Sequence, residues 1–326
     1  RRTPHVVPRN FWNLNLPGDA FSTRAMFYCN HDYIEKLHAQ DQSLKIAVGG
    51  PIGQKIFRGF LGLGDPVAAK VAELAERSGG GVVRQFLTKS DRFIPALLDG
   101  SLIEKPGIER IEGRSVVFTD RSKVDDVDTV VFCTGYRDQF PFLDAVEFDS
   151  ARDLYKHAFH PEIGQSLAWI GFVRPSTGGV PACSEMVARY FALLCSGARQ
   201  LPEDWRSRIA LEKAAEENVL RLHAGRIKSL VMWGDYMESM ALHIGCAPNL
   251  ITYLFTRPLL WFRLFYGPMV PAQYRLRGPH AQPAFARNVT LQVPLATPMP
   301  FSIAQSVLCV LGWIGGSLFG YRAPSW

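Results

Sequence analysis

The chain has 326 residues, which is enough to bury a large core and predicts about two domains. Its hydrophobic fraction of 47% is typical of a globular protein. The net charge of +6 is spread along the chain without aromatic interleaving, so the composition argues against a nucleic-acid-binding protein.

The first 125 residues predict alternating helices and strands. Asp65 and Pro66 fit the N-cap and first position of a helix that reaches Arg77. Two short strands with a helix between them are expected next, at residues 82–87, 91–98 and 102–105. This alternation favours an α/β fold with a mostly parallel sheet.

The run Asp128-Thr-Val-Val-Phe-Cys-Thr-Gly-Tyr136 carries the most information. Its apolar, β-branched residues predict a buried strand, with residues 115–119 as its neighbour. Gly135 lacks a Cβ, so the backbone there can approach another group closely. Ligands in open α/β sheets lie beyond the carboxyl ends of strands. The segment therefore either places backbone against a large cofactor or is a core strand that ends in an ordinary glycine turn.

The second half predicts mainly helices. Amphipathic patterns indicate helices at residues 182–196, 202–230 and 233–244. Met232, Met237 and Met240 are expected to fill the core. An apolar stretch at residues 250–266 is interrupted by Arg257-Pro258. His157 and His160 have neither acidic nor cysteine companions nearby, so they are assigned to a packed turn in preference to a metal site.

Several motifs in a fixed order resemble the flavin-containing monooxygenases, which are FAD- and NADPH-dependent enzymes. The family signature D-x-V-x-x-x-T-G-Y-x-x-x-F-P-F-L corresponds to residues 128–143. The further matching segments are Leu154–Pro161, Ser166–Val173, Arg174–Glu185, Asp235–Gly245, Pro248-Asn249, Gly267-Pro268, Gln273–Leu276 and Gly278-Pro279. The resemblance extends with gaps from residue 1 to about residue 290.

Both G-x-G-x-x-G loops of that family are missing from this sequence. The chain is therefore interpreted as the C-terminal part of a longer protein. The expected fold is an incomplete α/β flavoprotein with partial Rossmann-like sheets and a helical C-terminal extension. Its expected parts are a partial NADPH-binding domain (1–125), the C-terminal part of an FAD-binding domain (126–245) and the extension (246–326).

The resemblance implies the transfer of one oxygen atom from O2 to an amine or sulfide substrate through a C4a-hydroperoxyflavin. Such an enzyme binds and orients its cofactors and needs no catalytic triad or metal cluster. The alternatives are a Baeyer–Villiger or N-hydroxylating monooxygenase of the same class, or a non-catalytic membrane-associated remnant. Without the two phosphate loops, the chain alone is not expected to turn over. The sequence identifies neither the substrate nor a catalytic residue.

The resemblance also implies cofactor-binding residues. Arg1 and Arg2 stand where the family reads the 2′-phosphate of NADPH, although a solvated terminal pair is the alternative. Lys89 lies in a segment near the nicotinamide cofactor, or is an ordinary surface lysine. The segment formed by Cys133, Thr134 and Gly135 would pass close to both dinucleotides.

A second flavin contact is implied at residues 175–184, where a helix N-terminus would face the flavin ring and favour negative charge on it. Gly179 and Pro181 belong to this stretch, although Ser176-Thr-Gly-Gly replaces the usual P-x-G-S pattern. Glu185 is expected in the first turn of that helix, as a structural charge.

Two features bear on localisation. The six cysteines are scattered with no C-x-x-C pair, which favours a reducing compartment. Residues 301–320 carry no charge and are long enough for a membrane anchor, with a buried terminal helix as the alternative. The resemblance implies the cytosolic face of the endoplasmic reticulum membrane, and a cytoplasmic protein is the alternative.

Overall fold

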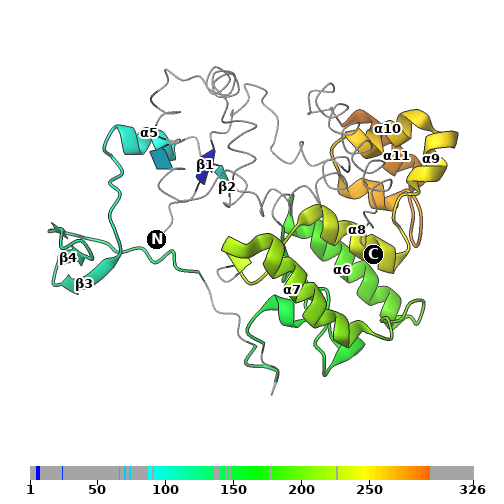
Figure 1. The fold of residues 1–326 in the computed structure, drawn as a ribbon, viewed down its shortest axis with the longest axis horizontal. Coiled ribbons are helices and arrows are strands. Elements are labelled where there is room, and N and C mark those ends of the chain that lie inside the picture. Colours follow the sequence, from blue (N-terminus) through cyan, green and yellow to red (C-terminus); the bar gives the residue numbers. More distant parts are fainter. Residues whose placement is uncertain are drawn as a thin grey trace, which may run out of the picture. The chain divides into compact units, whose positions relative to one another are not determined.

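The computed structural model is a mixed α/β protein with small sheets and several helices (Figure 1). The backbone contacts divide it into two units, one formed by Arg1–Leu14 and Pro51–Glu147, the other by Asn15–Gly50 and Phe148–Trp326. The structure describes residues 5–7, 24, 66, 70, 73–74, 87–89, 92–135, 140–143, 146, 148–175, 178–224 and 227–293.

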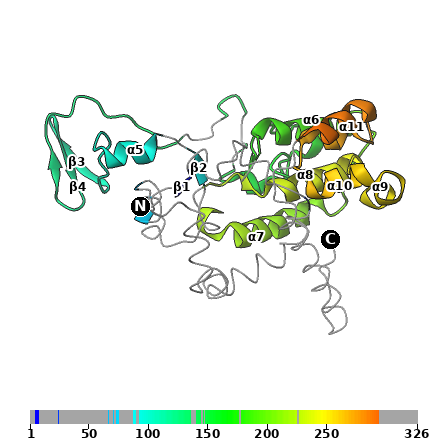
Figure 2. The same ribbon diagram turned by 90° about the horizontal axis from the view of Figure 1, so that it is seen from above.

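The first unit contains a parallel strand pair and an antiparallel three-stranded sheet. Strand β1 (His5–Val7) pairs in parallel with β2 (Leu87–Lys89). Strands β3 (Ile108–Glu112), β4 (Ser115–Phe118) and β5 (Lys123–Val124) form the second sheet in chain order, which is drawn at one end of Figure 2. The central strand of this small sheet is buried, because Val116 and Val117 of β4 are 4% and 6% exposed.

Two elements predicted for this unit are confirmed and two are wrong, and its three-stranded sheet is antiparallel where a mostly parallel sheet was expected. The predicted helix at 91–98 is α5 (Phe93–Leu98), and the predicted strand at 115–119 is β4. Residues 102–105 form no strand and are exposed. Residues 128–134 form no strand either, and Val131 and Phe132 are 76% and 80% exposed. The strand β4 takes β3 and β5 as its neighbours, so no described strand pairs with residues 128–134 and their apolar side chains stay exposed.

The second unit is built on two packed helices. Helix α6 (Val180–Cys195) and α8 (Trp233–Ile244) lie against each other, and α7 (Trp205–Ala224) lies beside them (Figures 1 and 2). All three confirm predicted helices: α8 has the predicted ends, and the ends of α6 and α7 are shifted by one to six residues. Their shared core is almost free of solvent, and its members include Cys183, Val187, Tyr190, Met237, Met240 and Ile244. Met237 and Met240 fill this core as predicted.

The chain after α8 forms a smaller helical layer. Helix α9 (Leu250–Thr256) begins at Asn249, whose side chain accepts a hydrogen bond from the Thr252 N–H. Helix α10 (Pro258–Tyr266) follows at once, a 3-10 turn η5 (Pro271–Arg275) leads on, and α11 (Pro283–Gln292) closes the layer. Leu260, Leu264, Leu276 and Ala286 make its core.

One buried arginine from early in the sequence ties these helices together. Arg24 is fully buried, and its guanidinium donates to Glu238 of α8, to the backbone oxygen of Leu264 and to Gln273 of η5. Because a buried cation is costly unless every donor is satisfied, this residue holds α8 and α10 in one arrangement.

Among the helices that the structure describes, none combines the length and the apolar character that a membrane crossing needs. The expected anchor at residues 301–320 lies outside the described residues.

Candidate functional site

Two paired parallel strands are each followed by a helix, and both helices begin at the carboxyl ends of the strands. Strand β6 (Arg174–Pro175) pairs in parallel with β7 (Leu230–Val231). Helix α6 follows the first and α8 follows the second within a few residues, so both begin beyond the carboxyl ends of the strands. This is the position at which α/β proteins bind ligands.

Neither helix start is capped by its own side chain. The N-cap residues are Gly179 for α6 and Met232 for α8, and neither carries an oxygen that could accept from the first N–H groups. Both residues have extended backbone, and Pro181 fits the first turn of α6 because it needs no hydrogen bond there. The Val180 N–H and the positive ends of two helix dipoles lie at this edge, whereas Pro181 has no N–H and the Ala182 N–H already donates to the Gly179 oxygen. The dipoles favour a group rich in acceptors, and the acidic Asp235 in the first turn of α8 opposes an anion.

A buried indole N–H lies at the same place. Trp233, the first residue of α8, is 2% exposed, and its Nε1 has no hydrogen-bond partner among the described residues. Gly178 faces the indole with a φ of +77°, and a Cβ there would lie 2.8 Å from Nε1. Only glycine meets both requirements. A buried indole N–H normally donates a hydrogen bond, so Trp233 Nε1 is a candidate donor to a ligand.

Side-chain contacts within α6 and with η5 stabilise the first two turns of α6. The Ser184 hydroxyl donates to the backbone oxygen of Val180 at 2.9 Å. Glu185 was expected in the first turn, but it lies one turn further along and forms an ion pair with Arg275 of η5. The reason is that α6 begins at Val180, so Glu185 is its sixth residue. It contributes to packing of the helix and not to the charge at its start.

A polar network behind β7 sets the strand's position. Arg152, in the 3-10 turn η3 (Ala151–Asp153), donates to the backbone oxygens of Ile227 and Leu230 at 3.2 and 2.8 Å. The same guanidinium binds Glu216 of α7 at 3.1 Å, and His157 binds that carboxylate at 2.9 Å. His157 is thus held by a carboxylate within a packed turn, and no His, Cys, Asp or Glu group in the described residues could hold a metal ion.

An aromatic cluster next to this network contains groups with shifted pKa values. His243 of α8 stacks on Tyr190 and lies 3.1 Å from the hydroxyl of Tyr155. Burial, with Lys156 and Arg208 adding to it, lowers the pKa of His243 to about 4. Burial raises the pKa of Tyr190 and of the Cys183 thiol to about 12 each. At neutral pH these groups are uncharged, so the interior behind the site carries no free charge from them.

The residues expected from the sequence to bind cofactors belong to both units of the chain. Gly179 and Pro181 lie at the start of α6, beside Gly178 and Trp233. Cys133, Thr134 and Gly135 belong to the first unit, where Cys133 is exposed and Gly135 has a φ of +94° with open space around it. Lys89 ends β2, and Arg1 and Arg2 lie outside the described residues.

Gly178 and Trp233 were missed in the sequence. The pair Gly178-Gly179 before a helix is a visible signal, because two glycines at a helix start permit close approach of a ligand. Nothing in the sequence alone indicates that Trp233, more than 50 residues later, would pack against them.

Comparison with known proteins gives a consistent result. Residues 77–295 match the family model described as FMO-like, flavin-binding monooxygenase-like. The 4-hydroxybenzoate brominase (decarboxylating) of Marinomonas mediterranea is 38% identical over 223 residues, which are 68% of this chain and 43% of the relative. The brominase of the same name from Pseudoalteromonas luteoviolacea is 41% identical over 219 residues, 66% of this chain and 42% of the relative. The flavin-containing monooxygenase 5 of Cavia porcellus is 34% identical over 201 residues, 60% and 37% of the two chains. The chain spans about two fifths of the length of these relatives.

Proposed function

Because the chain belongs to the flavin-binding monooxygenase-like family, we propose that it forms part of an FAD- and NADPH-dependent monooxygenase. The reaction would place one oxygen atom from O2 on a soft nitrogen or sulfur nucleophile. The observation that carries this proposal is the paired start of α6 and α8 at the carboxyl edge of β6 and β7, in a chain of this family.

The residues at that edge fit the acceptor-rich ring of a flavin. The N–H groups of Val180 and Gly234 and the Trp233 Nε1 would serve as donors, and a flavin ring offers carbonyl oxygens and ring nitrogens that accept. Bound flavin supplies the redox chemistry and the activation of oxygen. Gly178, Gly179 and Pro181 would let the ring approach the backbone, and Trp233 would orient it and exclude water.

The remaining cofactor contacts are proposals of the same kind. Cys133, Thr134 and Gly135 would lie against the dinucleotides, and the exposed side chain of Cys133 leaves room for such a contact. Lys89 would bind a phosphate of NADPH, and Arg1 and Arg2 its 2′-phosphate, because a guanidinium pairs well with a phosphate. Attachment to the endoplasmic reticulum membrane through residues 301–320 is likewise a proposal, based on the apolar sequence of that segment.

A second candidate is halogenation of a phenolic acid. It is favoured by the two brominases, which are 38% and 41% identical to the chain, against 34% for the flavin-containing monooxygenase 5 of Cavia porcellus. Bromide is also a soft nucleophile, so the same cofactor cradle would serve either reaction. The two candidates differ in what the substrate channel admits.

The test uses the full-length protein loaded with FAD and supplied with NADPH and 18O-labelled O2. A labelled N-oxide from N,N-dimethylaniline or a labelled sulfoxide from thioanisole would support the first candidate. Brominated product from 4-hydroxybenzoate and bromide, with neither oxide formed, would replace it by the second. NADPH oxidation that yields only hydrogen peroxide with all three substrates would contradict both. The same assay on this chain alone is expected to show no turnover.

A further inference from the structure

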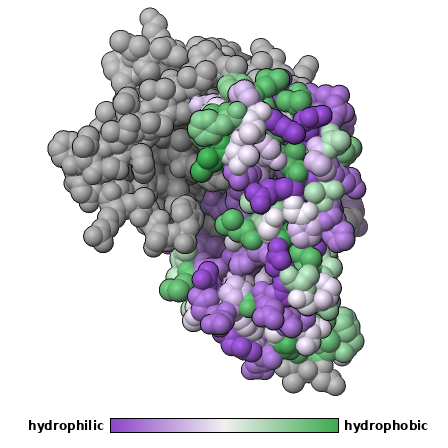
Figure 3. Space-filling model, turned by 90° about the vertical axis from the view of Figure 1, so that its right-hand side faces the viewer, coloured by the Kyte–Doolittle hydropathy of each residue, from purple (hydrophilic) through white to green (hydrophobic). Residues whose placement is uncertain are grey.

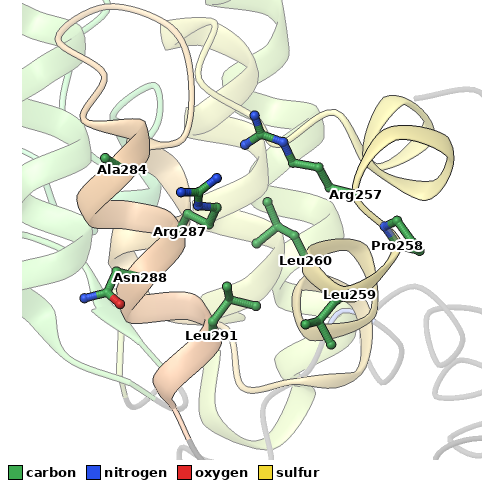
Figure 4. Close-up of a pocket in the computed structure, with 8 residues that line it drawn as sticks. All are labelled: Arg257, Pro258, Leu259, Leu260, Ala284, Arg287, Asn288 and Leu291. Atoms are coloured by element: carbon green, nitrogen blue, oxygen red, sulfur yellow. The ribbon is translucent and has the colours of Figure 1, made fainter.

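A pocket of about 460 Å³ opens between the junction of α9 and α10 and the helix α11 (Figure 4). Its size lies within the range of small-molecule sites. The residues that give it chemical character are Arg257, Leu259, Leu260, Arg287, Asn288 and Leu291. In Figure 4 both guanidinium groups lie on one side of Leu260, and the other two leucines lie on its opposite side.

The backbone fixes the position of Arg257. Its N–H donates to the Tyr253 oxygen at the end of α9, and its own oxygen accepts from the Trp261 N–H at the start of α10, both at 2.9 Å. The break is imposed by Pro258, since a residue before proline avoids helical backbone and Arg257 has φ −149° and ψ 68°. One residue therefore ends one helix and begins the next, which leaves its side chain at a defined rim position.

The opposite wall of the pocket is formed by α11, which is bonded to α10. Arg287 projects from the middle of α11, and that helix is tied to α10 by the Arg263 guanidinium, which donates to the Val293 oxygen at 2.9 Å. Leu260, 2% exposed, belongs to the small core shared by α10 and α11, and Leu291 packs against it. The floor of the pocket is thus an edge of a packed core.

The chain that forms the pocket carries an excess of positive charge. No Asp or Glu follows Glu238 in the chain, whereas six arginines do: Arg257, Arg263, Arg275, Arg277, Arg287 and Arg322. Among the described residues, Arg275 pairs with Glu185 and Arg263 binds a backbone oxygen, but no carboxylate pairs with Arg257 or Arg287. Figure 3 shows the end of the molecule that faces right in Figure 1, and there hydrophilic and apolar side chains are intermixed.

We propose that this pocket binds an amphiphilic organic anion, with the anionic head between Arg257 and Arg287 and the apolar body on Leu259, Leu260 and Leu291. A guanidinium fork matches a carboxylate or phosphate head, and leucines match an alkyl or aryl body. The site is separate from the edge of β6 and β7 and does not depend on the proposed oxygenation. Leu259, 64% exposed, gains burial when the body is bound.

The test titrates decanoate into the full-length, flavin-saturated protein by calorimetry. We expect one site, weaker binding of the uncharged analogue decanol, and loss of affinity as salt is raised. Arg257→Gln and Arg287→Gln should each weaken decanoate binding about tenfold, because each removes one charged hydrogen-bond donor at an exposed rim. Leu259→Ser should weaken it without affecting the fold, since this side chain is largely exposed in the free protein.

The matched control is Arg277→Gln, which removes the same charge from an exposed arginine of the same layer outside the pocket. If Arg277→Gln and Arg287→Gln lose the same affinity for decanoate, the loss reflects net charge and not the pocket, and the proposal is overturned. Unchanged binding in both pocket variants would also overturn it. A second arm uses phosphatidylglycerol vesicles: if these bind through Arg257 and Arg287 while decanoate does not, the occupant is a bilayer headgroup and the soluble-ligand site is refuted.

Discussion

The ion pair behind β7 provides the sharpest stability prediction. Arg152 is 1% exposed and His157 is 3% exposed, and both bind the carboxylate of Glu216, which is 25% exposed. Glu216→Leu leaves the buried guanidinium without its anion. Breaking a buried pair in this way costs about 3–5 kcal/mol. Because Glu216 keeps partial contact with water, we expect about 3 kcal/mol, or a melting temperature lower by about 6–12 °C.

The assay is urea or thermal unfolding of the full-length protein followed by circular dichroism. Glu217→Leu is the matched control, since this neighbour on α7 is exposed and its loss should change the free energy of unfolding by less than about 0.5 kcal/mol. The double variant Arg152→Met/Glu216→Leu removes both charges and should recover part of the loss, because an apolar pair can replace a buried ion pair. Equal stability of Glu216→Leu and Glu217→Leu would refute the reasoning, as would a double variant less stable than the sum of the single changes.

Three further measurements address the site and its surroundings. Gly178→Ala and Gly197→Ala place a Cβ at similar positive φ values, +77° and +72°, so backbone strain should cost each about 1 kcal/mol of stability. Only the Cβ at position 178 would clash with buried Trp233, so Gly178→Ala should lose more stability than Gly197→Ala, and it alone should lose flavin binding at least tenfold. If both variants keep flavin equally well, the cradle is placed wrongly. His243 has a folded pKa of about 4, below its unfolded value, so the unfolded state binds the extra proton between pH 6.5 and 4 and stability should fall by about 3 kcal/mol as pH drops through that window. His243→Gln should flatten this slope, and an unchanged slope would contradict the assignment. Bound FAD and NADP+ should slow alkylation of exposed Cys133 and leave the equally exposed Cys195 unaffected, whereas equal rates for Cys133 with and without cofactor would remove it from the site.

Helical periodicity predicted the helices of the second unit well, because a helix is determined mainly by residues that are close together in the sequence. Helix α8 begins and ends where the sequence predicts, and the break between α9 and α10 follows directly from Pro258. The strand expected at residues 128–134 failed because a strand needs neighbours that are chosen elsewhere in the chain. Trp233 was not predicted for the same reason, because its contact with Gly178 joins residues 55 positions apart and produces no periodic pattern in the sequence.

The charged side chains behind the candidate site are paired with one another, and this limits the chemistry that they can supply. Glu216 pairs with Arg152 and His157, and Glu212 pairs with Lys156, so these carboxylates hold the fold in place. His243, the imidazole nearest the shared core of α6 and α8, stays neutral above about pH 4. What the described residues do supply at the edge is a set of fixed donors, backed by side chains such as Val187 and Met237 that have no room to shift. Fixed donors of this kind suit a cofactor that brings its own redox chemistry, as the proposed flavin does.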